Sequence, residues 1–185
     1  KERGLALPDG VLTTDGASVA TDPDVDVVVE VLGGIEPARG YITAALHAAK
    51  PVVTANKELL ANVGGELAEV AEGAGVDLLF EAAVAGAIPL IRPLRESLVG
   101  ERITRVMGIV NGTTNFILTQ MAERGTGYAE ALAEAQSLGF AERDPTADVE
   151  GYDAGAKAAI IATIAFGSQV VAGDVYHEGI SNIGA

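Results

Sequence analysis

Two hydrophobic patterns follow each other in the first half of the chain, and they predict strands and helices in turn. Residues 27–32 form an almost unbroken, largely β-branched run, which is typical of a strand buried on both faces of a parallel sheet. A helix is expected over about 36–49, a short strand over 51–56, a helix over 57–73 that is interrupted at Gly64 and Gly65, and a third strand over 76–82. This order predicts part of a Rossmann-like, doubly wound α/β sheet.

The pattern changes after Glu81, where a loop rich in Gly and Ala leads past two prolines into a short helix. Residues 101–112 alternate as a strand of a second sheet would, and 175–183 could form a further short strand. Between them we expect an amphipathic helix that begins at Thr113, Thr114 or Asn115, a second that ends at Gly139, and a longer one through Lys157. We therefore predict a partial nucleotide-binding domain over 1–88 and a second, α+β substrate domain over 89–185.

Composition narrows the classes of function. The 185 residues carry a formal net charge of −14 and no cluster of basic residues, which argues against nucleic acid or an anionic membrane as partner. The absence of cysteine excludes thiolate catalysis and thiolate metal sites. The polar start predicts no signal peptide, and the apolar run after Lys157 is too short for a membrane span, so we expect a cytoplasmic protein.

The most informative segment lies just before Lys157. Five carboxylates precede this lysine in the sequence, and an apolar run follows it; they are Glu142, Asp144, Asp148, Glu150 and Asp153. If residues from 150 onward are helical, Glu150, Asp153 and Lys157 share one face. A lysine between carboxylates and an apolar helix can serve as a general acid and base, whereas the alternative is an ordinary solvated salt bridge.

Three motifs resemble those of the homoserine dehydrogenase family: TANKELLA (54–61), FEAAVAGAIPLI (80–91) and GFAERDPTADVEGYDAGAK (139–157). NGTTNFIL (111–118) and HEGI (177–180) add to the resemblance, which runs from about residue 27 to 183. It implies interconversion of L-homoserine and L-aspartate 4-semialdehyde with NAD or NADP, in threonine, methionine and isoleucine biosynthesis, by a homodimer. No G-x-G-x-x-G turn is present, so the chain is expected to be a central fragment of such an enzyme.

The resemblance also implies roles for individual residues. Lys157 matches the acid and base of the reaction, and Asp153 would orient both Lys157 and the substrate hydroxyl. Lys57 would lie beside the nicotinamide and the reacting carbon. The plainer interpretation, an exposed lysine in the first turn of a helix, is disfavoured because cations are favourable at helix C-termini. Glu142 and Asp148 would bind the substrate ammonium together with Asp153, and the plainer role for Asp148 is to stabilise a helix N-terminus.

Further positions are implied for the cofactor and for an ion. Gly139 and Gly33 match places where the backbone approaches the dinucleotide, which suits residues without Cβ. The family's monovalent cation loop corresponds to the carboxylate of Glu81 and the carbonyls of Val84, Gly86 and Ile88, which would bind Na⁺ or K⁺. Without the resemblance, this loop would be interpreted as a hinge rich in Gly and Ala.

Two other functions stay open at the level of sequence. The chain could be a non-catalytic binding or oligomerisation module that keeps this fold, or part of a dehydrogenase for a related small amino or oxo acid. Aspartate-semialdehyde dehydrogenase is excluded because that reaction needs a cysteine. The preference between NAD and NADP cannot be predicted, since the residue that decides it follows a strand outside this chain.

Overall fold

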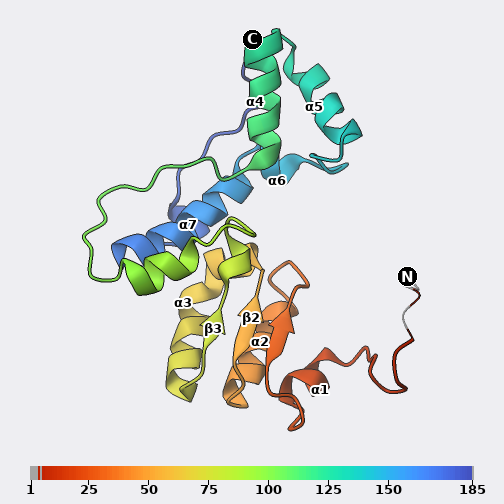
Figure 1. Ribbon diagram of the computed structural model, residues 1–185, viewed down its shortest axis with the longest axis vertical. Coiled ribbons are helices and arrows are strands. Elements are labelled where there is room, and N and C mark those ends of the chain that lie inside the picture. Colours follow the sequence, from red (N-terminus) through yellow and green to blue (C-terminus); the bar gives the residue numbers. More distant parts are fainter. Residues whose placement is uncertain (1–3, 5, 185) are drawn as a thin grey trace.

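A computed structural model describes residue 4 and residues 6–184, and its first half is a parallel three-stranded sheet packed against helices (Figure 1). The strands β1 (Val28–Glu30), β2 (Val52–Thr54) and β3 (Leu78–Leu79) lie in the order β1-β2-β3. Val28 pairs with Val52, and Val52 pairs with Leu78, so all three strands run in the same direction. The predicted α/β class and the order of its elements are confirmed, with strands shorter than expected.

Two helices connect these strands and pack against each other. α2 (Ala38–His47) buries Ile42 and Leu46 and leaves His47 exposed at its end. α3 (Lys57–Ala74) begins at the cap Asn56, whose Oδ1 accepts a hydrogen bond of 3.0 Å from the Leu59 amide. Before the sheet lies a short α1 (Gly16–Thr21), and the side chain of Asp15 caps it by accepting a hydrogen bond from the Ser18 amide.

The expected interruption of α3 at Gly64 and Gly65 is wrong, because the helix is continuous from Lys57 to Ala74. Each glycine costs a helix about 1 kcal/mol relative to alanine. That cost is offset by burial on the same helix, where Leu59 and Leu67 are fully inaccessible to solvent. Gly65 also lies where the side chain of Gln169 approaches the helix, so a Cβ at this position would collide with it.

The second half of the chain is helical within the described residues. Two short turns follow the sheet, η1 (Glu81–Ala83) and the π-helical η2 (Pro93–Ser97). The remaining elements are α4 (Gly112–Arg124), α5 (Tyr128–Ser137), α6 (Thr146–Val149), α7 (Tyr152–Phe166) and η3 (Ala172–Asp174). α4 packs against α5, and α7 crosses back to pack against α3, as Figure 1 shows.

The buried side chains form two clusters. The larger one includes the sheet, α2, α3 and η2 together with Ala159, Ile160 and Ile161 of α7. The smaller one joins α4, α5 and α6 around Ile117, with Ala131 and Ala135 at the helix contact. α7 therefore attaches the second half of the chain to the core of the first. Within the described part of the chain, no helix is long and apolar enough to cross a membrane.

Three local predictions are wrong. The expected strands over 101–112 and 175–183 are not formed, because no described segment runs beside either of them to complete a ladder of backbone hydrogen bonds. In the first segment Met107 and Ile109 are mostly exposed, at 80% and 78%. The helix expected from Thr113, Thr114 or Asn115 begins earlier, since the side chain of Asn111 accepts a hydrogen bond from the Thr114 amide and caps it.

The helix through Lys157 does not include Glu150. Gly151 separates α6 from α7 with a left-handed φ of 85°, and a Cβ there would lie 3.0 Å from the carbonyl oxygen of Glu178. Glu150 instead accepts a hydrogen bond from the hydroxyl of Ser181. The expected common face of Glu150, Asp153 and Lys157 therefore exists only for the last two.

Candidate active site

A buried carboxylate lies between two lysines that come from different elements. Asp153, in the first turn of α7, is 6% exposed. Its Oδ2 accepts a hydrogen bond of 2.6 Å from Lys157 Nζ, and its Oδ1 lies 3.1 Å from Lys57 Nζ. Lys157 Nζ also donates to the carbonyl oxygen of Val110 at 2.7 Å. One carboxylate thus orients two ammonium groups.

The positions of these three residues on α3 and α7 bring them together. Asp153 and Lys157 are four positions apart on α7, which places them on one face of the helix. Lys57 opens α3 just after the carboxyl end of β2, the edge where open parallel sheets place their ligands. Because α7 packs against α3, the first turns of the two helices bring Lys57 and Asp153 together.

Asn111 adds a fourth member to this cluster. Its Nδ2 donates to Asp153 Oδ2 at 2.9 Å and to Asp148 Oδ1 at 2.7 Å. The sequence predicts none of this, because the partners lie 42 and 37 positions away. An Asn-Gly pair after an extended segment indicates a helix cap, and that signal could have identified the residue but not its partners.

The electrostatics of the cluster favour the ionised form of Asp153. Burial by itself raises the pKa of this carboxyl, but the hydrogen bonds from Lys157, Asn111 and Lys57 outweigh burial and lower the pKa below its ordinary value. The charge is therefore retained at neutral pH. Lys157 is mostly buried, with 17% of its side chain exposed, whereas 42% of the Lys57 side chain is exposed.

A second buried polar network lies at the carboxyl ends of β1 and β2, just before Lys57 in the chain. The hydroxyl of Thr54 donates to Glu30 Oε2 at 2.5 Å and accepts from the Asn56 amide at 3.0 Å. The side-chain amide of Asn56 then donates to the carbonyl of Gly34 at 2.6 Å. This network fixes the loop that carries Gly33 next to the start of α3. Sequence reasoning missed Glu30 and Thr54, which look like ordinary strand residues.

Gly33 and Gly34 present open backbone at this edge of the sheet. Both have left-handed φ, 81° and 72°, and a Cβ at either position would meet nothing within 4 Å. A flat group can therefore approach the main chain here, as the sequence prediction for Gly33 requires. Gly139 also has a left-handed φ of 79° and open space around it, but it lies just after α5, where its amide donates to the carbonyl of Gln136.

The two predicted ammonium-binding carboxylates have different surroundings. Asp148 is half-buried in α6 and is held by Asn111, which connects it to Asp153. Glu142 is exposed, and its carboxylate has no hydrogen-bond or ion-pair partner among the residues that the structure describes. The structure thus joins Asp148 to the cluster and leaves Glu142 outside its bonded network.

In the predicted cation loop, the carboxylate of Glu81 accepts hydrogen bonds from three backbone amides. Glu81 Oε1 accepts from the amides of Leu90 and Ile91 at 2.8 and 3.1 Å, and Oε2 accepts from the Arg92 amide at 2.7 Å. The carboxylate thus caps the helical turn that leads into η2. Among the residues that the structure describes, Oε2 accepts this one hydrogen bond, so a second lone pair remains for a further partner.

Between Glu81 and that turn, the main chain curls tightly. Ala85 and Ala87 have left-handed φ of 53° and 66°, and they alternate with Val84, Gly86 and Ile88, the residues whose carbonyls were expected to bind the ion. Left-handed φ is unfavourable for alanine, so this conformation is strained and is held by its surroundings. The donor set of one carboxylate and carbonyls suits a monovalent ion better than a divalent one.

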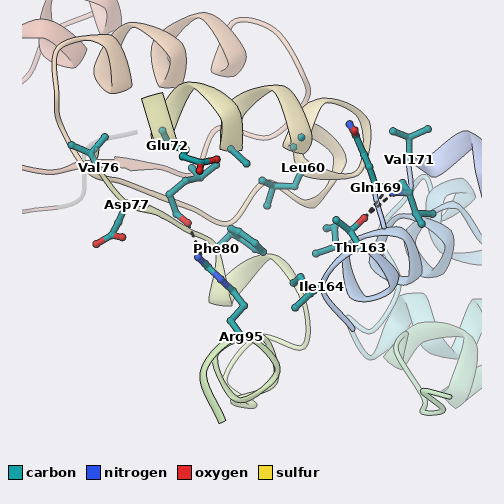
Figure 2. Close-up of a pocket in the computed structure, with 17 residues that line it drawn as sticks. Leu60, Glu72, Val76, Asp77, Phe80, Arg95, Thr163, Ile164, Gln169 and Val171 are labelled. Carbon is teal, nitrogen blue, oxygen red and sulfur yellow. Dashed lines mark hydrogen bonds between the residues drawn. The ribbon is translucent and has the colours of Figure 1, made fainter. Parts of the chain in front are cut away.

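A separate cavity of about 350 Å³ lies between α3, β3 and α7 (Figure 2). Its walls are mostly apolar, and Leu60 and Ile164 are among the residues that form them. At one side the guanidinium of Arg95 lies 5.3 Å from the centre of the Phe80 ring. Neither lysine of the cluster nor Asp153 lines this cavity, so it is distinct from the candidate active site.

Comparison with known proteins gives a consistent result along the whole chain. Residues 1–81 match the family model described as homoserine dehydrogenase, NAD binding domain, and residues 89–185 match the model described as homoserine dehydrogenase. The homoserine dehydrogenase of Mycobacterium tuberculosis is 60% identical over 182 residues, which cover 98% of this chain and 41% of that protein.

Solved structures agree with this result. The crystal structure of a homoserine dehydrogenase from Thiobacillus denitrificans has a TM-score of 0.90 and 49% identity, and the match covers 93% of this chain and 40% of that one. A hyperthermophilic archaeal homoserine dehydrogenase in complex with NADPH has a TM-score of 0.79 and 35% identity, over 85% of this chain and 49% of that one. The chain spans about two fifths of the length of the curated relatives it matches.

Proposed function

The chain belongs to the homoserine dehydrogenase family, and from that premise we propose that the full-length protein oxidises L-homoserine to L-aspartate 4-semialdehyde with NAD or NADP, and catalyses the reverse reaction. The observation that carries this proposal is the position of Asp153, buried between Lys57 and Lys157. A carboxylate that orients a largely buried lysine supplies what removal of a hydroxyl proton needs.

In the proposed reaction, the neutral amine of Lys157 accepts the proton of the substrate hydroxyl at Nζ as the C–H bond of the same carbon breaks. A nicotinamide cofactor, when bound, would supply the acceptor for the hydride that leaves that carbon. In the reverse direction the Lys157 ammonium returns the proton to the developing alkoxide. Two of its three N–H groups are donated to Val110 and Asp153, which leaves the third for the substrate oxygen.

The other residues have roles in binding. Lys57, partly exposed at the edge of the sheet, is proposed to lie beside the nicotinamide and the substrate. Gly33 offers the open backbone that a flat ring requires, and Gly139 is proposed as a second backbone contact of the cofactor. Glu142 and Asp148, with Asp153, are proposed to bind the substrate ammonium.

The loop over 81–88 is proposed to bind Na⁺ or K⁺ through Glu81 and the carbonyls of Val84, Gly86 and Ile88. The free acceptor site of Glu81 and the curled main chain support this proposal. The ion would stabilise the connection between the sheet and the helical half. A homodimer and a place in threonine, methionine and isoleucine biosynthesis belong to the same proposal, and they rest on membership of the family.

The test is homoserine-dependent reduction of NAD and NADP by the full-length protein, with Lys157→Ala and Lys157→Arg measured beside the wild type. Both variants should lose about 100- to 10,000-fold in kcat, because neither side chain can accept the proton. Alanine has no amine, and arginine keeps the charge but does not deprotonate. Far-UV circular dichroism shows whether each variant is folded. A folded Lys157→Ala variant with wild-type turnover would refute the acid and base role, and a folded wild type that does not oxidise homoserine would refute the substrate.

A further inference from the structure

The side chain of Asn111 uses every hydrogen-bonding group it has, and the proposed reaction does not explain why. It is 8% exposed at the cap of α4. Both hydrogens of its amide are donated to carboxylates, to Asp148 at 2.7 Å and to Asp153 at 2.9 Å. Its oxygen accepts from Thr114 twice, from the backbone amide at 2.8 Å and from the hydroxyl at 3.0 Å.

We propose that Asn111 is a positioning residue that holds Asp148 and Asp153 at a fixed separation and orientation. This inference rests on the proposed function, in which Asp148 binds the substrate ammonium and Asp153 orients Lys157. A single substrate molecule has to meet both carboxylates at once, so the distance between them decides whether its hydroxyl reaches Lys157. Asn111 fixes that distance without touching the substrate itself.

The need for such a residue follows from charge. Two carboxylates that face one site repel each other, and in the absence of a donor between them they separate or one takes up a proton. A neutral amide with two N–H groups contacts both without neutralising either. Because the oxygen of the same amide is held by Thr114, the two donors have only one direction in which to point.

No other side chain satisfies these contacts equally well. Aspartate can cap the helix but has no donors, serine and threonine can cap it but offer one donor each at shorter reach, and glutamine is longer by one methylene. The residue before Asn111 contacts the same site, since the carbonyl of Val110 accepts a hydrogen bond from Lys157. The turn of Val110 and Asn111 therefore contacts the lysine and both carboxylates where α4, α6 and α7 meet (Figure 1).

Asn111→Asp separates positioning from capping, because it keeps an oxygen for the Thr114 amide and loses both donors. At about pH 8, kcat/KM for homoserine in the full-length protein should fall about 10- to 100-fold, as expected for lost hydrogen bonds to buried charges. As the pH falls toward about 5.5, the ratio of variant to wild type should rise. The introduced carboxyl, facing two carboxylates, takes up a proton readily and regains one donor.

Asn115→Asp is the matched control, since it makes the same charge change at an exposed position of the same helix. It should stay within about twofold of the wild type at both pH values. Asn111→Ser, which can cap but cannot reach both carboxylates, should also lose activity, with a weaker dependence on pH than Asn111→Asp because it introduces no third carboxyl. Wild-type kcat/KM in Asn111→Asp, or a loss equal at both pH values, would overturn the inference.

A second measurement keeps this test independent of the proposed function. The urea midpoint of Asn111→Asp, relative to Asn115→Asp, should be lowered more at about pH 8 than at about pH 5.5, whatever substrate the protein uses. If the wild type does not oxidise homoserine, the proposed function fails while this midpoint still decides the role of Asn111. Equal shifts at the two pH values would show that Asn111 does not hold the carboxylates.

Discussion

Replacing Asp153 with asparagine removes the charge that two lysines share while it keeps the shape of the side chain. Asp153 accepts from Lys157 at 2.6 Å, from Asn111 at 2.9 Å and faces Lys57 at 3.1 Å. The variant retains one oxygen for these three donors, and its new amide group adds a fourth donor to the cluster. Because the amide oxygen has two lone pairs, at least one of the three donors loses its partner and faces the new N–H group.

The size of the effect follows from the exposure of each pair. The Lys157–Asp153 pair is buried, with side chains 17% and 5% exposed, and removal of one partner of such a pair costs about 3–5 kcal/mol. The asparagine oxygen recovers about 1 kcal/mol by accepting one hydrogen bond. The Lys57 side chain is 42% exposed, so solvent screens its pair with Asp153 and the loss there is below about 1 kcal/mol. The free energy of unfolding should fall by about 3 kcal/mol.

The assay is urea unfolding of the full-length protein at neutral pH, followed by far-UV circular dichroism. Asp144→Asn is the matched control, because this carboxylate belongs to the same acidic segment but is exposed, and among the described residues it accepts hydrogen bonds only from Thr146, two positions later. Its midpoint should stay close to that of the wild type. A loss below about 1 kcal/mol in Asp153→Asn would show that the buried pair does not stabilise the fold as reasoned from its burial.

The pH dependence gives a second check with a definite sign. The pKa of Asp153 is lowered in the folded protein, so its contribution to stability is fully present above the ordinary carboxyl pKa of about 4. It is lost as the pH falls through the lower, folded pKa. The difference in stability between wild type and Asp153→Asn should therefore be constant from about pH 6 to 8 and shrink below about pH 4. A difference that grows under acid would contradict the lowered pKa.

Two further variants test parts of the fold outside the Asp153 cluster. Glu81→Gln should lower the free energy of unfolding by about 1–2 kcal/mol, as measured by thermal melting. One of the two oxygens that cap the turn into η2 is replaced by an NH2 group, which faces a backbone amide. Melting in buffers with and without NaCl also shows whether an ion contributes at this loop. Lys50→Met should cost about 1–2 kcal/mol in the same melting assay, since the buried Nζ donates to the carbonyls of Asp22 and Val25, and the apolar replacement recovers only part of that loss.

The sequence predicts those features that depend on neighbouring residues. The run over 27–32, the cap Asn56 and the spacing of Asp153 and Lys157 are all local, and the structure confirms the strand, the start of α3 and the i, i+4 pair. The continuity of α3 was not predicted, because the burial that offsets two glycines comes from contacts with other elements. Helix propensity alone overestimates how strongly the two glycines interrupt the helix.

The remaining features depend on distant contacts. Asn111 reaches partners 37 and 42 positions away, and Glu30 meets Thr54 across two strands. Alternation over 101–112 predicts a strand, but a strand forms only where another segment supplies backbone partners. The family motifs placed Lys157, Asp153 and Lys57 among the candidate residues through their resemblance to a known family. They did not indicate that one carboxylate lies between the two lysines.

The packing of α3 against α7, more than the ion pairs, determines the geometry of this site. The Lys57–Asp153 pair is partly exposed and contributes about 0–1 kcal/mol, which is too little to hold two helices together. Leu60 of α3 and Ile160 and Ile161 of α7 are buried in one cluster, and burial contributes about 1.5–3 kcal/mol for each side chain. The distance between Lys57 and Asp153 is therefore a consequence of the hydrophobic contact. A cavity made in that contact should change the position of Lys57 relative to Asp153 even though no charged residue is altered.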